Sequence, residues 1–149
     1  MFERIVVGTD GSGTACEAVR QAATLAQLAG ARLHIVHAFQ SVPGIAAIGL
    51  DAGVAALAAG LPEAAEKDAN NVLERAAEIA RRTCTDVEVH LHMGDAASGL
   101  LDVAEREKAD LLVVGNRGMS GVKRFVLGSV PNKVSHHTPC NLLIINTTG

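Results

Sequence analysis

Hydrophobic residues occur along the chain in short runs that are separated by longer segments with helical periodicity. The runs are rich in Val, Ile and Leu, and they lie at Ile5–Val7, Leu33–Phe39, Val87–Leu91, Leu111–Val114 and Leu142–Ile145. Short runs of this composition are typical of strands buried inside a parallel sheet. The pattern therefore predicts five buried strands.

The segments between these runs are predicted to be helices. Thr14 and Glu17 have the spacing of a capping box, so the first helix is expected to begin at Thr14 and to end at Gly30. The other helices are expected at about Glu63–Thr83, at Ala97–Lys108 and from Ser129 onward. Strands that alternate with helices predict an α/β fold, a doubly wound parallel sheet with helices on both faces.

The most distinctive spacing follows the fourth predicted strand. Gly115, Gly118, Gly128 and Ser129 form the pattern G-x2-G-x9-G-S. Glycines behind a strand let the backbone approach a ligand closely, and a Gly-Ser pair that opens a helix directs N–H groups at an anion. The pattern predicts a phosphate-binding site, and two ordinary turns are the alternative.

This spacing, together with Arg4-Ile-Val-Val-Gly-Thr-Asp-Gly-Ser near the N-terminus, resembles the ATP-binding members of the universal stress protein family. The resemblance extends to the last strand, with departures at Asn116, Pro131 and Asn141 that leave the motif glycines in place. It implies one domain over residues 1–149 and a Rossmann-like five-stranded sheet of order 3-2-1-4-5. Strands one and four would then be neighbours, and the loops that leave them would converge on one crevice.

The resemblance also implies which residues contact an adenine nucleotide. Asp10 is the one carboxylate expected at the mouth of the site, where it would bond ribose or base donors or hold magnesium through water. Its alternative role is that of a turn residue beside Gly11. The other residues implied to line the site are Gly8, Thr9, Ala38, Gly115, Arg117, Gly118, Met119, Ser120, Gly121, Gly128, Ser129 and Val130.

Composition and charge narrow the classes of partner. The net charge is −3 with no block of like charge, which argues against nucleic acid or an anionic membrane. Met1 is not followed by a signal-peptide pattern, so we expect a cytoplasmic protein. The apolar segment Ile45–Leu61 contains Asp51 and several glycines, which favours a loop or short helix over a membrane span.

Cysteine and histidine patterns indicate no metal site. The three cysteines, Cys16, Cys84 and Cys140, lack the C-x2-C spacing of zinc sites, and their odd number does not suggest a disulfide framework. His90 and His92 alternate to one face of a strand, but no third ligand is evident from the spacing. We interpret the histidines as structural.

The sequence thus predicts a regulatory protein that binds ATP, with magnesium as a candidate accompanying ion, and that acts through its conformation or an unknown protein partner. No nucleophile–base pair is evident beside the phosphates, so turnover is expected to be slow at most. A slow ATPase or autokinase with Ser120 or Ser129 as acceptor, and a cyclic AMP (cAMP)-binding protein, are the alternatives. The apolar edge strand Leu142–Ile145 predicts a homodimer, which the resemblance implies to be antiparallel.

Overall fold

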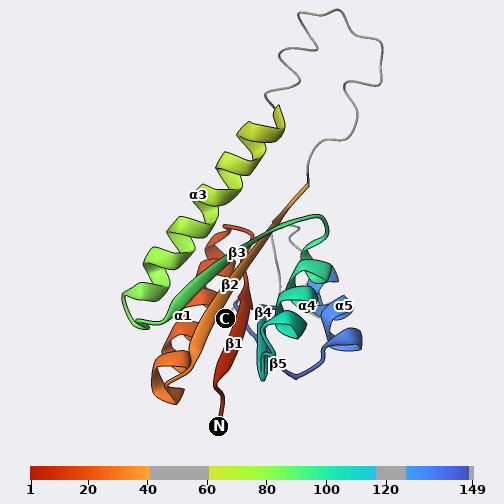
Figure 1. Cartoon of the computed structure of the whole chain (residues 1–149). Coiled ribbons are helices and arrows are strands. Elements are labelled where there is room, and N and C mark those ends of the chain that lie inside the picture. The colour runs from red at the N-terminus through yellow and green to blue at the C-terminus, as the bar shows by residue number, and fades with distance from the viewer. Residues whose placement is uncertain (41–60, 117–126, 148–149) are drawn as a thin grey trace, which may run out of the picture.

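The computed structural model describes residues 1–40, 61–116 and 127–147, which form one parallel five-stranded sheet covered by helices (Figure 1). The elements are β1 (Arg4–Gly8), α1 (Gly13–Ala29), β2 (Arg32–Phe39), α3 (Leu61–Arg81), β3 (Val87–Met93), α4 (Ala96–Arg106), β4 (Leu111–Gly115), α5 (Ser129–His137) and β5 (Asn141–Ile145). The strand order is β3-β2-β1-β4-β5. The predicted fold class and strand order are confirmed.

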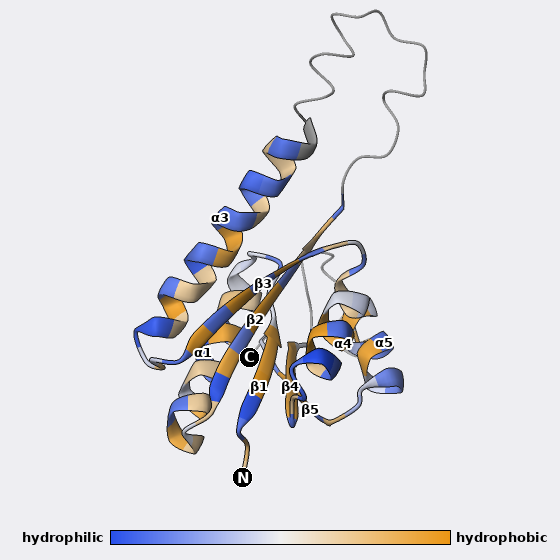
Figure 2. Ribbon diagram, viewed as in Figure 1, coloured by the Kyte–Doolittle hydropathy of each residue, from blue (hydrophilic) through white to orange (hydrophobic). Residues whose placement is uncertain are grey.

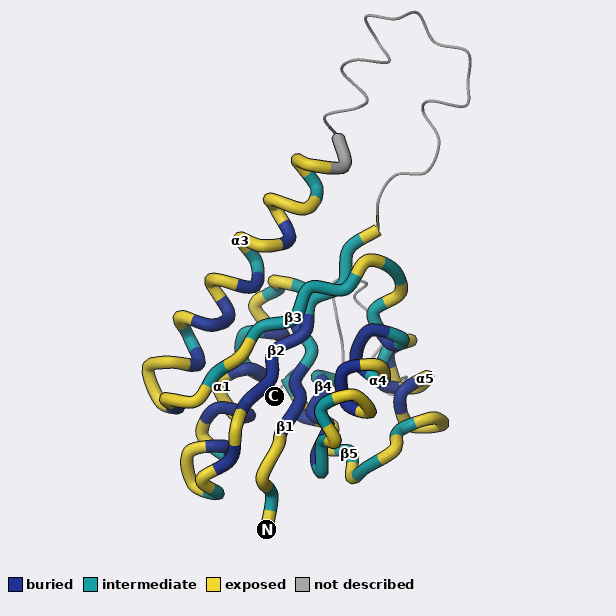
Figure 3. The backbone as a smooth tube through the Cα atoms, viewed as in Figure 1, coloured by how far each residue is buried: buried dark blue, intermediate teal, exposed yellow. Residues whose placement is uncertain are grey.

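The sheet separates two hydrophobic cores. Ile5 and Val7 of β1 pack with α1 and α3 on one face, whereas Val6 between them packs with α4 and α5 on the other. This division follows from the alternation of side chains along a strand. Hydrophobic residues accordingly fill the strands and the inner sides of the helices (Figure 2), and burial is greatest in β1 and β4 and falls toward the edge strands β3 and β5 (Figure 3).

The start of α1 differs from the prediction. Ser12, not Thr14, is the N-cap residue, because its Oγ accepts a hydrogen bond from the backbone N–H of Ala15 at 3.2 Å. The Asp10 carboxylate accepts from the backbone N–H of Ser12 at 2.9 Å and so turns the chain before the helix begins. Glu17 bonds Arg20 and Gln21 instead of closing a capping box.

The other predicted bounds agree with the structure to within two residues. Gly30 ends α1 in the left-handed conformation, with φ of 68°, as expected for a glycine just after a helix. Among the described residues, no helix is long and apolar enough to cross a membrane. Residues 41–60, which include most of the segment interpreted as a loop, lie outside the described residues.

Candidate functional site

A cavity of about 300 Å³ lies at the carboxyl ends of β1, β2 and β4. β1 leads into α1 on one face of the sheet, and its neighbour β4 is followed by α5 on the other face. The chain order therefore reverses between these two strands, which is where doubly wound sheets place their ligands. We call this space the switch-point cavity.

All predicted site residues within the described part of the chain line the switch-point cavity. They are Gly8, Thr9, Asp10, Ala38, Gly115, Gly128, Ser129 and Val130. The remaining predicted residues, Arg117, Gly118, Met119, Ser120 and Gly121, lie outside the described residues. The structure thus brings together four separate parts of the sequence at one place.

The cavity also has an apolar wall that the sequence does not predict. This wall is formed by Ala15, Val36, Ala96, Leu100, Val114 and Pro131. Val36 could have been found from its position two residues before Ala38, because residues two apart share a face of a strand. Ala96 and Leu100 come from α4, and no motif marks them. Aliphatic walls around a few polar groups are typical of small-molecule sites.

The loop after β1 is held by hydrogen bonds of its own. The backbone N–H of Thr9 donates to the carbonyl of Val36 at 2.9 Å, and the Thr9 hydroxyl accepts from the N–H of Gly11 at 3.2 Å. Gly11 has φ of +80°, a conformation that L side chains rarely adopt. Thr9 and Asp10 are therefore presented to the cavity by a defined turn.

Asn116 connects the end of β4 to Gly128 and to the segment after β5. Its carbonyl accepts from the N–H of Gly128 at 3.2 Å, and its side-chain Oδ1 accepts from the backbone N–H and the hydroxyl of Thr147 at 3.0 and 2.9 Å. Its own N–H donates to the carbonyl of Ile145 at 2.9 Å. This departure from the family pattern thus ties the cavity to the segment that follows β5.

The first turn of α5 presents backbone donors toward the cavity. Gly128 is the N-cap, and Ser129 and Val130 are the first helical residues. The first N–H groups of a helix have no intrahelical acceptor, and the helix dipole places partial positive charge there. Pro131 has no N–H, and proline is tolerated in the first turn of a helix. This end of α5 is suited to an anion.

An ion pair joins α4 to α5 beside the cavity. Asp95 is the N-cap of α4 and accepts from the backbone N–H of Ser98 at 3.0 Å and from Lys133 Nζ of α5 at 2.8 Å. The bond from Lys133, followed by those from Ser98, lowers the pKa of Asp95 to about 2. Asp95 is therefore ionised at neutral pH.

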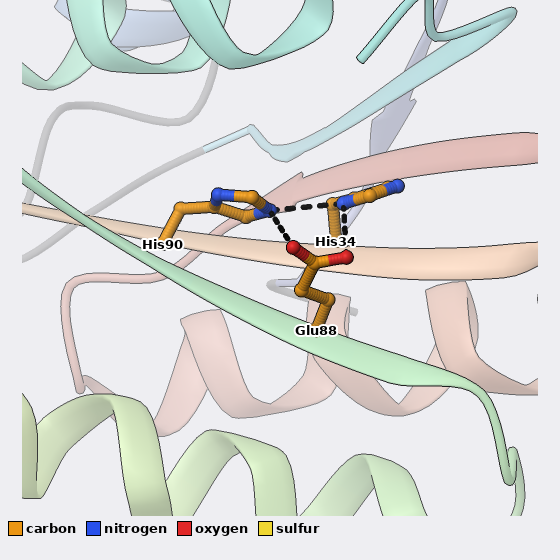
Figure 4. A group of neighbouring side chains, drawn as sticks. All are labelled: His34, Glu88 and His90. Atoms are coloured by element: carbon orange, nitrogen blue, oxygen red, sulfur yellow. Dashed lines mark hydrogen bonds and ion pairs between the residues drawn. The ribbon is translucent and has the colours of Figure 1, made fainter.

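The structure gathers a second polar group elsewhere on the sheet. Nδ1 of His34 in β2 lies 2.9 Å from Nε2 of His90 in β3, and the carboxylate of Glu88 lies 3.8 and 3.9 Å from these two nitrogens (Figure 4). The spacing of His90 and His92 indicates no third ligand, because His34 comes from the neighbouring strand β2. We call these three residues the histidine–glutamate cluster.

The fold and the switch-point cavity together define a doubly wound α/β domain with a small-molecule site. Residues 1–146 match the universal stress protein family, and the chain belongs to this family. A universal stress protein of Thermus aquaticus is 37% identical over 145 residues, 97% of this chain and 99% of that protein. One of Mycobacterium tuberculosis is 35% identical over 153 aligned positions, 99% of this chain and 98% of that protein.

A solved structure is similar over the same length. A universal stress protein in complex with cAMP is 31% identical to the chain and superposes with a TM-score of 0.70. The match covers 99% of this chain and 98% of that one. The similarity therefore includes all the elements that surround the switch-point cavity.

Proposed function

We propose that the chain is a cytoplasmic, single-domain regulatory protein of the ATP-binding subgroup, and that it holds ATP in the switch-point cavity. The main support is that separate glycine-bearing parts of the sequence converge on a cavity with an apolar wall and a helix N-terminus. A relative of known structure binds cAMP, an adenine nucleotide, which supports the same ligand class.

The lining residues suggest how the nucleotide is held. The apolar wall around Val36, Ala38 and Leu100 suits a flat ring such as adenine, and the volume is near the lower end of the usual range of about 300–1,000 Å³. The nucleoside would fill the cavity, and the phosphates would extend toward the first turn of α5. Arg117–Gly121 would surround these phosphates, as the family resemblance implies.

Asp10 would bond the ribose hydroxyls, or would hold a magnesium ion through water. The carboxylate is an acceptor only, so it fits hydroxyl donors and a hydrated cation and not bare phosphate oxygens. When bound, magnesium would supply positive charge to the phosphates. Asp10 already accepts from the backbone N–H of Ser12, and this bond orients its side chain for either role.

Binding, and not rapid turnover, is the proposed activity. Among the described residues that line the cavity, Asp10 is the one with an ionisable side chain, so these residues supply no acid–base pair. The protein would act through a nucleotide-dependent conformation that a protein partner recognises. A slow ATPase or autokinase that uses Ser129, at the start of α5, or Ser120 is the enzymatic alternative.

The nucleotide released from the purified protein on denaturation tests the ligand. We expect about one ATP per chain, and calorimetric titration of nucleotide-free protein should rank ATP above AMP and cAMP. Recovery of cAMP, or a higher affinity for it, would establish cAMP as the ligand instead. The proposal is wrong if no adenine nucleotide binds.

We further propose that the chain forms a homodimer through β5. This strand is at the edge of the sheet, and Leu143 and Ile144 are 40% and 37% exposed. The same strand of a second copy, antiparallel across a twofold axis, would cover these side chains. Light scattering should give a dimeric mass for the wild type and a monomeric mass for Leu143→Asp.

Leu28→Asp is the matched control for the dimer. Leu28 is also an exposed leucine, but it lies on α1, so this variant should remain dimeric. A monomeric wild type at micromolar concentration would contradict the proposed interface. Ile145→Asp is not a suitable test, because Ile145 is buried in the core and its replacement would unfold the protein.

A further inference from the structure

The histidine–glutamate cluster lies on the face of the sheet that α4 covers. β2 and β3 pair in parallel with His34 opposite Glu88, and His90 follows Glu88 by two residues, so all three side chains share one face. Arg106, the last residue of α4, contacts the outer nitrogen of His90. No member of the cluster lines the switch-point cavity.

The hydrogen bonds assign the protons of the two rings. Arg106 can only donate, so at 3.1 Å it makes Nδ1 of His90 an acceptor and places the proton of this ring on Nε2. His90 Nε2 then donates to Nδ1 of His34, which puts the proton of His34 on Nε2. A lone pair of His34 therefore points at the centre of the cluster.

A structural role does not explain His34. The residue is 1% exposed, and its Nε2 has no hydrogen-bond partner among the described residues. A buried donor without a partner destabilises a fold, and an aliphatic residue at this position would avoid that cost. Burial, and for His34 also the neighbouring His90, lowers the pKa of both rings, so both are neutral at pH 7.

We propose that His34, Glu88 and His90 form a binding site for a divalent metal ion of the zinc class. Nδ1 of His34, Nε2 of His90 and the Glu88 carboxylate would be the ligands, and a fourth position would hold water. Two imidazoles and one carboxylate are a frequent ligand set for zinc with an open position. Their donor atoms lie within 4.8 Å of one another.

The distances fit a tetrahedral ion after small movements. Two nitrogens bound to zinc at about 2.0–2.1 Å lie about 3.3 Å apart in a tetrahedron. The two ring nitrogens, now 2.9 Å apart, must therefore separate slightly, and the carboxylate must move in from 3.8 and 3.9 Å. The Glu88 side chain is about half exposed, so it is able to make this movement.

The donor set selects the class of metal. Neutral imidazole nitrogens are preferred by zinc, copper and nickel, whereas magnesium and calcium require oxygen ligands. Only Glu88 supplies oxygen within the cluster. The site should therefore bind zinc and discriminate strongly against magnesium. Any magnesium that accompanies a nucleotide would thus bind elsewhere.

Arg106 opposes metal binding in two ways. Its charge repels a cation, and a metal on Nε2 of His90 would move the ring proton to Nδ1, where Arg106 donates now. Arg106 is exposed and also bonds Glu107, so its side chain is able to leave His90. Removing its charge should strengthen the site by about tenfold, the order expected for a divalent ion and a monovalent cation a few ångströms apart when water screens them, as it does for the exposed Arg106.

Titration of the untagged, nucleotide-free protein with Zn²⁺ tests the site by calorimetry. We expect one ion per chain and no detectable Mg²⁺ binding at the same concentrations. His90→Ala and Glu88→Gln should each weaken the binding by at least about tenfold, since even changes behind the ligands cost this much. Both residues are partly exposed, and circular dichroism will verify that the variants fold.

Two matched controls locate the zinc ion. His92 lies on the same strand and face as His90, and His92→Ala should leave zinc affinity unchanged. The double variant His136→Ala/His137→Ala removes an exposed histidine pair of α5 and should also leave it unchanged. Arg106→Gln should bind more tightly. The proposal is overturned if zinc binding survives His90→Ala or disappears in either control. It is also overturned if Arg106→Gln binds zinc more weakly than the wild type, or if the wild type does not bind one ion per chain.

Discussion

The switch-point cavity and the histidine–glutamate cluster are built on the same sheet in opposite ways. The cavity is formed at the ends of strands by backbone, glycines and short aliphatic side chains. The cluster is formed on neighbouring edge and inner strands by long polar side chains, and its two histidines are 56 residues apart in the chain. A site made of backbone leaves a motif in the sequence, whereas a site made across strands does not.

The two regions also differ in what supports them. Hydrogen bonds between the loops and neighbouring strands fix the borders of the cavity before any ligand arrives, as at Thr9 and Asn116. In the cluster, the buried Nε2 of His34 has no hydrogen-bond partner within the described part of the chain, and the cation at Arg106 is able to leave His90. The cavity is therefore suited to a ligand that binds with little rearrangement of the protein. The cluster is suited to a ligand whose binding rearranges the hydrogen bonds of the cluster.

The largest expected effect is at Gly128, where a side chain would occupy the cavity border. A Cβ there would lie 3.3 Å from the carbonyl oxygen of Asn116 and 3.5 Å from Pro131, and the further methyl groups of valine would enter the site. The φ of Gly128 is −59°, so space and not backbone conformation requires glycine. Gly128→Val should weaken nucleotide binding at least about 100-fold, or 2.7 kcal/mol.

Gly13→Ala is the control for this variant. A Cβ at Gly13 would meet no atom of residues 1–40, 61–116 or 127–147 within 4 Å, so nucleotide affinity measured by calorimetry should not change. Circular dichroism must show that Gly128→Val folds. A folded Gly128→Val protein with wild-type affinity would mean that the cavity is not the nucleotide site.

A smaller effect is expected at Asp10, which has two separable roles. Asp10→Ala should weaken ATP binding by about 1–3 kcal/mol if the carboxylate accepts a hydrogen bond from the buried ligand. Asp10→Asn keeps an acceptor for the N–H of Ser12 and removes only the charge, so it should retain the thermal stability that Asp10→Ala loses. If Asp10→Ala binds ATP like the wild type, Asp10 is a turn residue alone.

The sequence predicts the switch-point cavity better than the histidine–glutamate cluster, because the cavity is built from local motifs and the cluster from contacts between strands. Within the described part of the chain, the residues predicted to form the site behind β1 and β4 line one cavity, and their contact with a nucleotide stays a prediction. The strands and the order of elements depend on local patterns, so the sequence predicts them closely. The start of α1 is predicted wrongly. Ser12 and Thr14 are both good N-cap residues, and the turn at Asp10 decides between them. The wall residue Leu100 comes from a helix face that no local pattern relates to β1.

The histidine–glutamate cluster depends on strand register. The alternation of Glu88, His90 and His92 on one face was visible in the sequence, but His34 becomes their neighbour only when β2 and β3 pair with His34 opposite Glu88. Register is set by side-chain patterning and by turn geometry, and two parallel strands joined through a helix have no tight turn to set it. The contact between His34 and His90 is therefore evident in the structure and not in the order of residues along the chain.

The ion pair beside the cavity should make a modest contribution to stability. Asp95→Ala should lower the free energy of unfolding by about 1 kcal/mol, mainly through the lost helix cap, because the partly exposed pair with Lys133 adds little. Denaturant unfolding will measure this difference. Asp102→Ala, an exposed change on the same helix, should have almost no effect.

The pH dependence of this contribution has a definite sign. The pKa of Asp95 is lowered from 3.8 to about 2 in the folded protein, so the stabilisation by its charge is complete above pH 3.8. It is lost as the pH falls through about 2. The difference in stability between the wild type and Asp95→Ala should therefore shrink over this interval, and a constant difference would show that the charge of Asp95 does not contribute.

The smallest effect is expected between the two regions. His90 lies opposite the wall residue Val36 in the register of β2 and β3, but it does not line the cavity itself. His90→Ala should therefore change nucleotide affinity by only about 0.5 kcal/mol, the low end of the range for neighbouring residues. His92 packs against Gly99 beside the wall residue Leu100, so His92→Ala should have the larger effect on nucleotide affinity. If calorimetry shows that His90→Ala weakens nucleotide binding more than His92→Ala does, the cluster and the cavity are coupled parts of one site.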